Sequence, residues 1–182
     1  MNQILSILIL VSFLSLNQND RTSKIDKYVA SVEMAYKNKK LISKEPESMS
    51  SIGGAVTGYY SDTKLILIQT VYAGEYGYQS YDFYLKNDTL VFVKEVQLTL
   101  KVDNTAQYEE YVKKHTNKAG DVDLSEFPLK INDVNTYYFD NDSIIDFTMK
   151  SFNISAETTQ SELQQINLNI ISRFKTHLAE LR

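Results

Sequence analysis

Residues 83–102, FYLKNDTLVFVKEVQLTLKV, have the pattern of two strands joined by a tight polar turn. Asparagine and aspartate tolerate positive φ better than other non-glycine residues, so Asn87-Asp88 suits the turn of a hairpin. The alternation after the turn predicts a strand with one buried and one solvated face. We expect Leu90, Phe92, Val96, Leu98, Leu100 and Val102 to be buried, and Glu95, Gln97, Thr99 and Lys101 to be solvated.

The same unit occurs three times along the chain. Residues 59–65, 83–90 and 137–144 each consist of an aromatic pair, a polar turn and an aliphatic strand. A further hairpin is expected at Gly74-Glu75-Tyr76-Gly77, because glycines flank two runs of strand-forming residues. Turn residues that recur at short intervals between such runs are typical of an antiparallel meander.

Helices are expected on both sides of the strand region. Apolar residues fall at helical spacing between residues 23 and 40, and a short helix is expected over residues 104–115. Thr159 and Glu162 form a capping box ahead of a long apolar stripe, which consists of Leu163, Ile166, Ile170, Phe174, Leu178 and Leu181. The predicted fold class is α+β, with an antiparallel meander or hairpin sheet packed against N- and C-terminal amphipathic helices.

The N-terminus has the pattern of an export signal. Residues 4–16 are apolar apart from three serines, a run that is short for a membrane span and typical of a signal peptide. The alternatives are a buried N-terminal helix or an uncleaved anchor. We expect residues 1–20 to be a signal segment and residues 21–182 to form a single α+β domain. The mature protein would then be periplasmic or extracellular, with no membrane attachment after cleavage.

Composition excludes several classes of chemistry. The chain has no cysteine, so disulfides, thiol nucleophiles and Cys-ligated metals are absent. A formal net charge of −4 gives no general attraction to nucleic acid, so none is expected as a partner. Asp121 and Asp123 have the opening spacing of a calcium loop, but the glycine and glutamate that complete it are missing. His115 and His177 lie near predicted helix ends, where capping or exposure is expected. We therefore expect no metal, no cofactor and no catalytic residue.

The chain contains 13 tyrosines, and a group of them surrounds one predicted hairpin. Exposed tyrosine clusters are common at recognition surfaces, because the ring provides a large contact area at a low entropic cost. Strands also select aromatic residues for packing, and this remains the alternative. The candidate binding residues are Tyr72, Tyr76, Tyr78, Tyr81 and Tyr84.

Two segments carry a resemblance to other proteins. Residues 53–68, GGAVTGYYSDTKLILI, and residues 82–95, DFYLKNDTLVFVKE, resemble small exported proteins of unknown function from Bacteroidota that have aromatic-rich hairpin units. The resemblance implies no catalytic residues. The sequence thus favours an exported, non-enzymatic binding or interaction module with a protein or glycan partner. An extracellular hydrolase that uses a carboxylate pair, or an immunity or inhibitor protein, is the alternative, and the oligomeric state is open.

Overall fold

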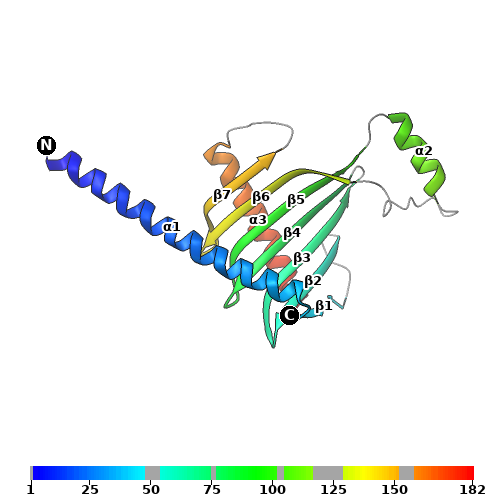
Figure 1. The fold of residues 1–182 in the computed structure, drawn as a ribbon, viewed down its shortest axis with the longest axis horizontal. Coiled ribbons are helices and arrows are strands. Elements are labelled where there is room, and N and C mark those ends of the chain that lie inside the picture. Colours follow the sequence, from blue (N-terminus) through cyan, green and yellow to red (C-terminus); the bar gives the residue numbers. More distant parts are fainter. Residues whose placement is uncertain (1, 48–53, 75–76, 102–104, 117–128, 152–157) are drawn as a thin grey trace.

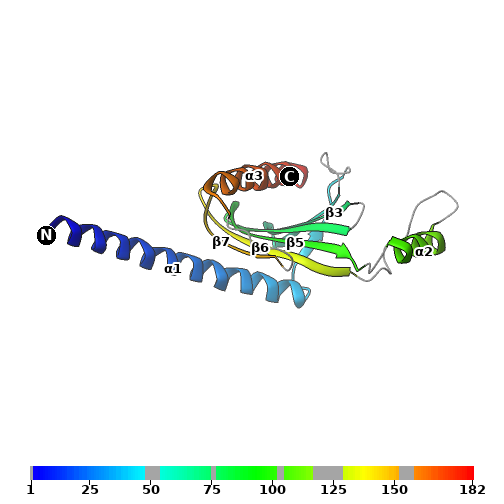
Figure 2. The same ribbon diagram turned by 90° about the horizontal axis from the view of Figure 1, so that it is seen from above.

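One antiparallel sheet forms the centre of the protein, and a long helix lies on each of its faces (Figures 1 and 2). The computed structural model describes residues 2–47, 54–74, 77–101, 105–116, 129–151 and 158–182. In chain order the elements are α1 (Asn2–Lys37), β1 (Ile42–Lys44), β2 (Ala55–Ser61), β3 (Lys64–Gly74), β4 (Gly77–Lys86), β5 (Thr89–Leu100), α2 (Thr105–His115), β6 (Leu129–Asp140), β7 (Ser143–Ser151) and α3 (Gln160–Glu180).

The seven strands follow one another across the sheet in the order of the chain, and each pairs antiparallel with its neighbours. The predicted meander and the α+β class are therefore confirmed. β1 is an addition to the prediction. Its residues 42–44 pair with residues 58–60 of β2. The β3–β4 hairpin is also confirmed by the pairing of Gly74 with Gly77, while Glu75 and Tyr76 lie outside the described residues.

The polar turns of the repeated unit have the predicted backbone conformation. Asn87 and Asp88 have φ of 52° and 62°, and Asn141 and Asp142 have φ of 49° and 61°. Two successive residues with positive φ form a primed turn, whose twist matches that of the flanking strands. In the first unit Asp62 has a φ of 56°.

A β-bulge follows each of these three turns, and the sequence pattern did not reveal it. The pairing register shifts at Tyr59/Tyr60, at Tyr84/Leu85 and at Tyr138/Phe139. In the second hairpin, Leu90 pairs with Leu85 and Phe92 with Tyr84, so that Val91 is the extra residue. An extra residue changes which face the following side chains occupy.

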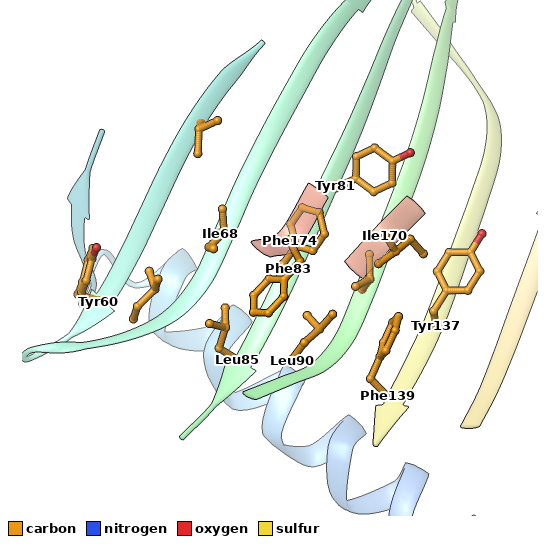
Figure 3. Packing of buried hydrophobic residues seen from close by; sticks show 13 residues of the cluster. Tyr60, Ile68, Tyr81, Phe83, Leu85, Leu90, Tyr137, Phe139, Ile170 and Phe174 are labelled. Carbon is orange, nitrogen blue, oxygen red and sulfur yellow. The ribbon is translucent and has the colours of Figure 1, made fainter. Parts of the chain in front are cut away.

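The predicted alternation of β5 is therefore wrong. Leu90 belongs to the buried cluster that contains Phe174 of α3, whereas Phe92 belongs to the cluster on the opposite face that contains Val32 of α1. The expectation of one wet face fails for a second reason, because α1 and α3 cover opposite faces of the sheet (Figure 2). Each face has its own core. The α3 side contains the larger cluster, and Figure 3 shows Phe83, Leu85, Leu90, Phe139, Ile170 and Phe174 within it.

Helix α1 begins earlier than predicted and is continuous. It runs through both the predicted signal segment and the predicted amphipathic helix, and its N-terminal part extends past the sheet (Figures 1 and 2). The described side-chain contacts between α1 and the sheet begin at Arg21, which pairs with Asp140 at 2.8 Å. Within the described ranges, none of the helices has the length and apolar character needed to cross a membrane.

The other two helices agree closely with the sequence. α2 spans Thr105–His115, within the predicted residues 104–115. The Thr159 hydroxyl accepts a hydrogen bond from the Glu162 backbone amide, and the Glu162 carboxylate accepts one from the Thr159 amide. This reciprocal pair is the predicted capping box, and it fixes where α3 begins.

We expect Asn141→Val to lower the free energy of unfolding by about 1–2 kcal/mol, because a β-branched residue fits poorly at positive φ. Asn141→Gly should be tolerated, since glycine adopts this conformation freely. Urea unfolding would measure both changes. Thr148→Val, an exposed substitution on β7, is the control and should change stability by less than about 0.5 kcal/mol. Equal stability of the Asn141→Val and Asn141→Gly variants would contradict the assigned turn.

Candidate functional site

The structure divides the candidate tyrosines between the two faces of the sheet. Tyr72 and Tyr81 belong to the core beneath α3, and their rings meet edge to face. Tyr84 lies on the opposite face, buried against Phe92 and the α1 side. Tyr78 is half-buried, and Tyr76 lies outside the described residues. The described members of the group therefore do not form one surface, and the polar site that the structure assembles contains only some of them.

The centre of that site is the carboxylate of Glu95, at the middle of the sheet on the α3 side. Its Oε1 atom accepts hydrogen bonds from Gln79 Nε2 at 2.7 Å and from Tyr81 Oη at 2.9 Å. Its Oε2 atom accepts from Asn135 Nδ2 at 3.1 Å and from Tyr137 Oη at 3.0 Å. Each oxygen thus receives two donors, which fills the approximately four acceptor positions of a carboxylate.

The strand register explains how four donors reach one carboxylate. On β5, Glu95 pairs with Tyr81 of β4 on one side and with Asn135 of β6 on the other. Each neighbouring strand has an amide residue and a tyrosine two positions apart, and residues i and i+2 share a face of a strand. Gln79 and Tyr81 therefore approach from β4, while Asn135 and Tyr137 approach from β6.

Glu95 was expected on the solvated face, and this prediction is wrong. The bulge at Val91 places Val93 in the core beneath α3, and Glu95 follows two positions later on that face. It is half-buried. The available sequence signal was the repeated amide-x-tyrosine pattern in two strands that flank an acidic strand. This pattern predicts the contacts of Glu95 only when the strand order and the position of the bulge are known.

The two hydroxyl donors have altered acid–base properties. The pKa of Tyr81 and that of Tyr137 are raised above the usual value of 10.0, first by burial and then by the Glu95 charge and the hydrogen bond to it. Both phenols therefore stay protonated and act as donors. The site is thus an array of neutral donors fixed around one carboxylate.

A hollow of about 380 Å³ lies between this array and α3. Its volume is within the range of small-molecule sites, which is about 300–1,000 Å³. Glu95 is the one carboxylate among the described residues that line it. The lining consists of Gln79, Tyr81, Glu95, Asn135, Tyr137, Met149, Ile166, Asn169, Ile170 and Arg173.

Arg173 is the cation of this hollow. Its guanidinium carbon lies 4.8 Å from the ring centroid of Tyr72 and 5.4 Å from that of Tyr81. Both distances are in the range of cation–π contacts. The side chain is half-buried, and the described part of the chain supplies no ion pair to it. Two of the candidate tyrosines thus act as a platform for a residue that the sequence analysis did not single out.

His177 has a different role from the expected one. It is fully buried, its Nε2 atom is 2.5 Å from Tyr72 Oη, and its Nδ1 atom is 2.9 Å from Glu180 Oε2. Both ring nitrogens therefore have partners, and the end of α3 is attached to β3. The prediction that His177 caps a helix end or is exposed is wrong, because the ring faces the sheet. This contact also holds Tyr72 in place beneath Arg173.

Polar contacts also lie on the face of the sheet that α1 covers. Tyr138 Oη donates to Asp26 at 2.7 Å, and burial with this hydrogen bond raises the pKa of Tyr138 to about 12. Asp82 accepts a hydrogen bond from Gln69 at 2.9 Å, and burial raises its carboxyl pKa. A larger hollow of about 850 Å³ lies between the end of α1 and the turns at residues 61–64 and 86–88. It lacks a fixed polar array like that around Glu95 within the described residues.

Comparisons with known proteins give no match, either to a family model, to a curated protein or to a solved structure. In the described ranges, no group of three or more histidine, aspartate or glutamate side chains is arranged to hold a metal ion. The calcium-like Asp121 and Asp123 lie outside those ranges.

We expect the free energy of unfolding to fall as the pH rises above about 10. Tyrosines of the unfolded chain ionise near 10.0, whereas burial keeps Tyr137 protonated in the folded protein, so rising pH favours the unfolded state. Each such tyrosine contributes a slope of up to about 1.4 kcal/mol per pH unit. Tyr137→Phe should reduce the slope by about that amount in urea unfolding series above and below this pH.

Phe139→Leu is the matched control, because it changes the same strand and the same core without removing a titrating group. It should lower stability at every pH and leave the slope unchanged. A Tyr137→Phe variant whose slope equals that of the wild type would show that Tyr137 does not resist ionisation in the folded protein.

Proposed function

We propose that the protein is an exported, non-enzymatic binding module that holds a polar ligand in the hollow above Glu95. The observation that carries this proposal is the fixed donor array. Four neutral side chains are locked around one carboxylate, and the guanidinium of Arg173, which has no ion pair with the described part of the chain, lines the same space. Preorganised polar groups in a concave site are a feature of small-molecule recognition.

A glycan suits this hollow better than a protein segment. Gln79 and Asn135 each use an amide N–H towards Glu95, which leaves their carbonyl oxygens as acceptors for hydroxyl groups. Sugars present several hydroxyl groups in a small volume, so amides, phenols and a guanidinium can each find a partner. A protein partner would need a wider contact area than a hollow of about 380 Å³ provides.

The hollow favours binding over hydrolysis. Glycosidases of the common type place two carboxyl groups about 5–9 Å apart across the scissile bond. Among the described lining residues, Glu95 is the only carboxylate, and its acceptor positions are already occupied by four donors. It is therefore poorly placed to attack a sugar or to protonate a leaving group.

The described contacts of α1 are compatible with removal of the predicted signal segment. The described contacts of α1 with the sheet begin at Arg21, immediately after the segment expected to be removed. Val29 and Val32, which pack into the α1-side core, also lie beyond it. Removal of residues 1–20 would therefore leave these contacts in place.

We expect Asn169→Trp to abolish ligand binding, because Asn169 is exposed and lines the hollow, so that an indole ring there would fill it. The measurement is binding of labelled protein to an array of neutral and acidic oligosaccharides. Leu168→Trp is the matched control, since Leu168 is exposed on the same helix and does not line the hollow. If Asn169→Trp and wild type bound the same oligosaccharides equally, the hollow would not be the site.

We also expect residues 1–20 to direct export. A fusion of residues 1–30 to an alkaline phosphatase that is active only outside the cytoplasm should give activity in a bacterial host. The matched control carries residues 21–30 alone and should give none. Equal activity of the two fusions would argue against the signal segment.

A further inference from the structure

We infer that Arg173 makes the site selective for acidic sugars, by binding the carboxylate of a uronic acid unit in the hollow. The inference rests on the proposed function and names the ligand class of the same site. The position of the guanidinium supports this role. Arg173 projects from α3 over the rings of Tyr72 and Tyr81 at the wall of the hollow.

The platform beneath Arg173 restricts the orientation of its planar group. Tyr72 is held by its hydrogen bond to the buried His177, and Tyr81 by its hydrogen bond to Glu95. A guanidinium resting on two fixed rings loses little further freedom when a ligand binds. Its edge carries paired N–H donors whose geometry matches a carboxylate, and such bidentate pairs are among the strong hydrogen bonds.

Glu95 lines the same hollow but forms no ion pair with Arg173 in the described structure. Both carboxylate oxygens already receive two donors each, from β4 and from β6. Within the described residues the guanidinium is left with aromatic contacts and without an anion. A half-buried cation without a partner is costly for stability, and such costs are a feature of binding sites.

Glu95 also opposes an anionic ligand, so its distance matters. It contacts the hydroxyl end of Tyr81, whereas Arg173 lies over the ring. A carboxylate in direct contact with the guanidinium is therefore closer to the cation than to Glu95. Coulomb energy varies with the inverse of distance, so the attraction exceeds the repulsion. Glu95 still penalises a bare anion that lacks other contacts, which favours a sugar acid over a simple ion.

The remaining groups of the hollow fit the rest of the sugar. Asn169 lies one helical turn before Arg173 on the same face of α3. Its Oδ1 atom accepts from Gln165 at 3.1 Å, which leaves the Asn169 amide N–H as a donor. Together with the carbonyl oxygens of Gln79 and Asn135, the hollow offers both donors and acceptors to hydroxyl groups.

The test compares trigalacturonate with its methyl ester, which has the same sugar units but no charge. Isothermal titration at low salt would measure both affinities for the wild type, Arg173→Gln and Arg173→Lys. We expect the wild type to bind the acid at least about tenfold more tightly than the ester. Arg173→Gln should lose this preference, so that the acid and the ester bind with similar affinity. Arg173→Lys should keep part of the preference, because lysine retains the charge but not the bidentate geometry.

Lys175→Gln is the control for net charge, since Lys175 lies on the same helix but pairs with Asp142 on the surface. It should bind like the wild type. Thermal unfolding of each variant would check that α3 remains packed on the sheet.

Three outcomes would overturn the inference. If the wild type bound the acid and the ester with equal affinity, the inferred selectivity for acidic sugars would be wrong, but the proposed binding function would not be contradicted. If Arg173→Gln still preferred the acid to the ester, a residue other than Arg173 would cause the selectivity. Failure of both probes to bind would reject uronic acids as the ligand, and the oligosaccharide array with Asn169→Trp would then decide the proposed function separately.

Discussion

The carboxylate of Glu95 is half-buried in the middle of the sheet, and its hydrogen bonds connect three strands. A charged group in such a position is costly unless donors surround it. Four side chains meet that need, two from β4 and two from β6. The same contacts fix the orientation of two tyrosines and two amides. The polar side chains that line the hollow are therefore held in place by their hydrogen bonds to the Glu95 carboxylate.

The β-bulges determine which face of the sheet this charge occupies. All three repeated hairpins have a bulge at the equivalent place, just after the polar turn. In β5 the extra residue is Val91, and it separates Leu90 on the α3 side from Phe92 on the α1 side. Without it, the parity of the strand would place Glu95 on the face that α1 covers in part. Two helices on opposite faces can thus each obtain an apolar patch from one set of strands.

Helix α3 completes the site, and its own placement depends on the core. Ile170 and Phe174 bury its inner side, while His177 attaches its end to Tyr72. Arg173 lies between these anchors and reaches the tyrosine rings rather than a carboxylate. The site therefore combines a carboxylate that four donors surround with a guanidinium that, among the described residues, has aromatic contacts but no ion pair. The guanidinium edge of Arg173 supports the proposed recognition of an acidic ligand. Core packing alone does not require an arginine at this position.

The sequence by itself determined the local features, namely the strand-rich meander, the Asn87-Asp88 and Asn141-Asp142 turns, and the Thr159 capping box that begins α3. These depend on backbone preferences and hydrogen bonds within a few residues, so a short window contains the necessary information. Only the tertiary structure decided that Glu95 faces α3, that Tyr84 lies on the opposite face from Tyr81, and that His177 is buried. Bulge positions and helix placement decide these contacts, and both depend on packing between residues far apart in the chain.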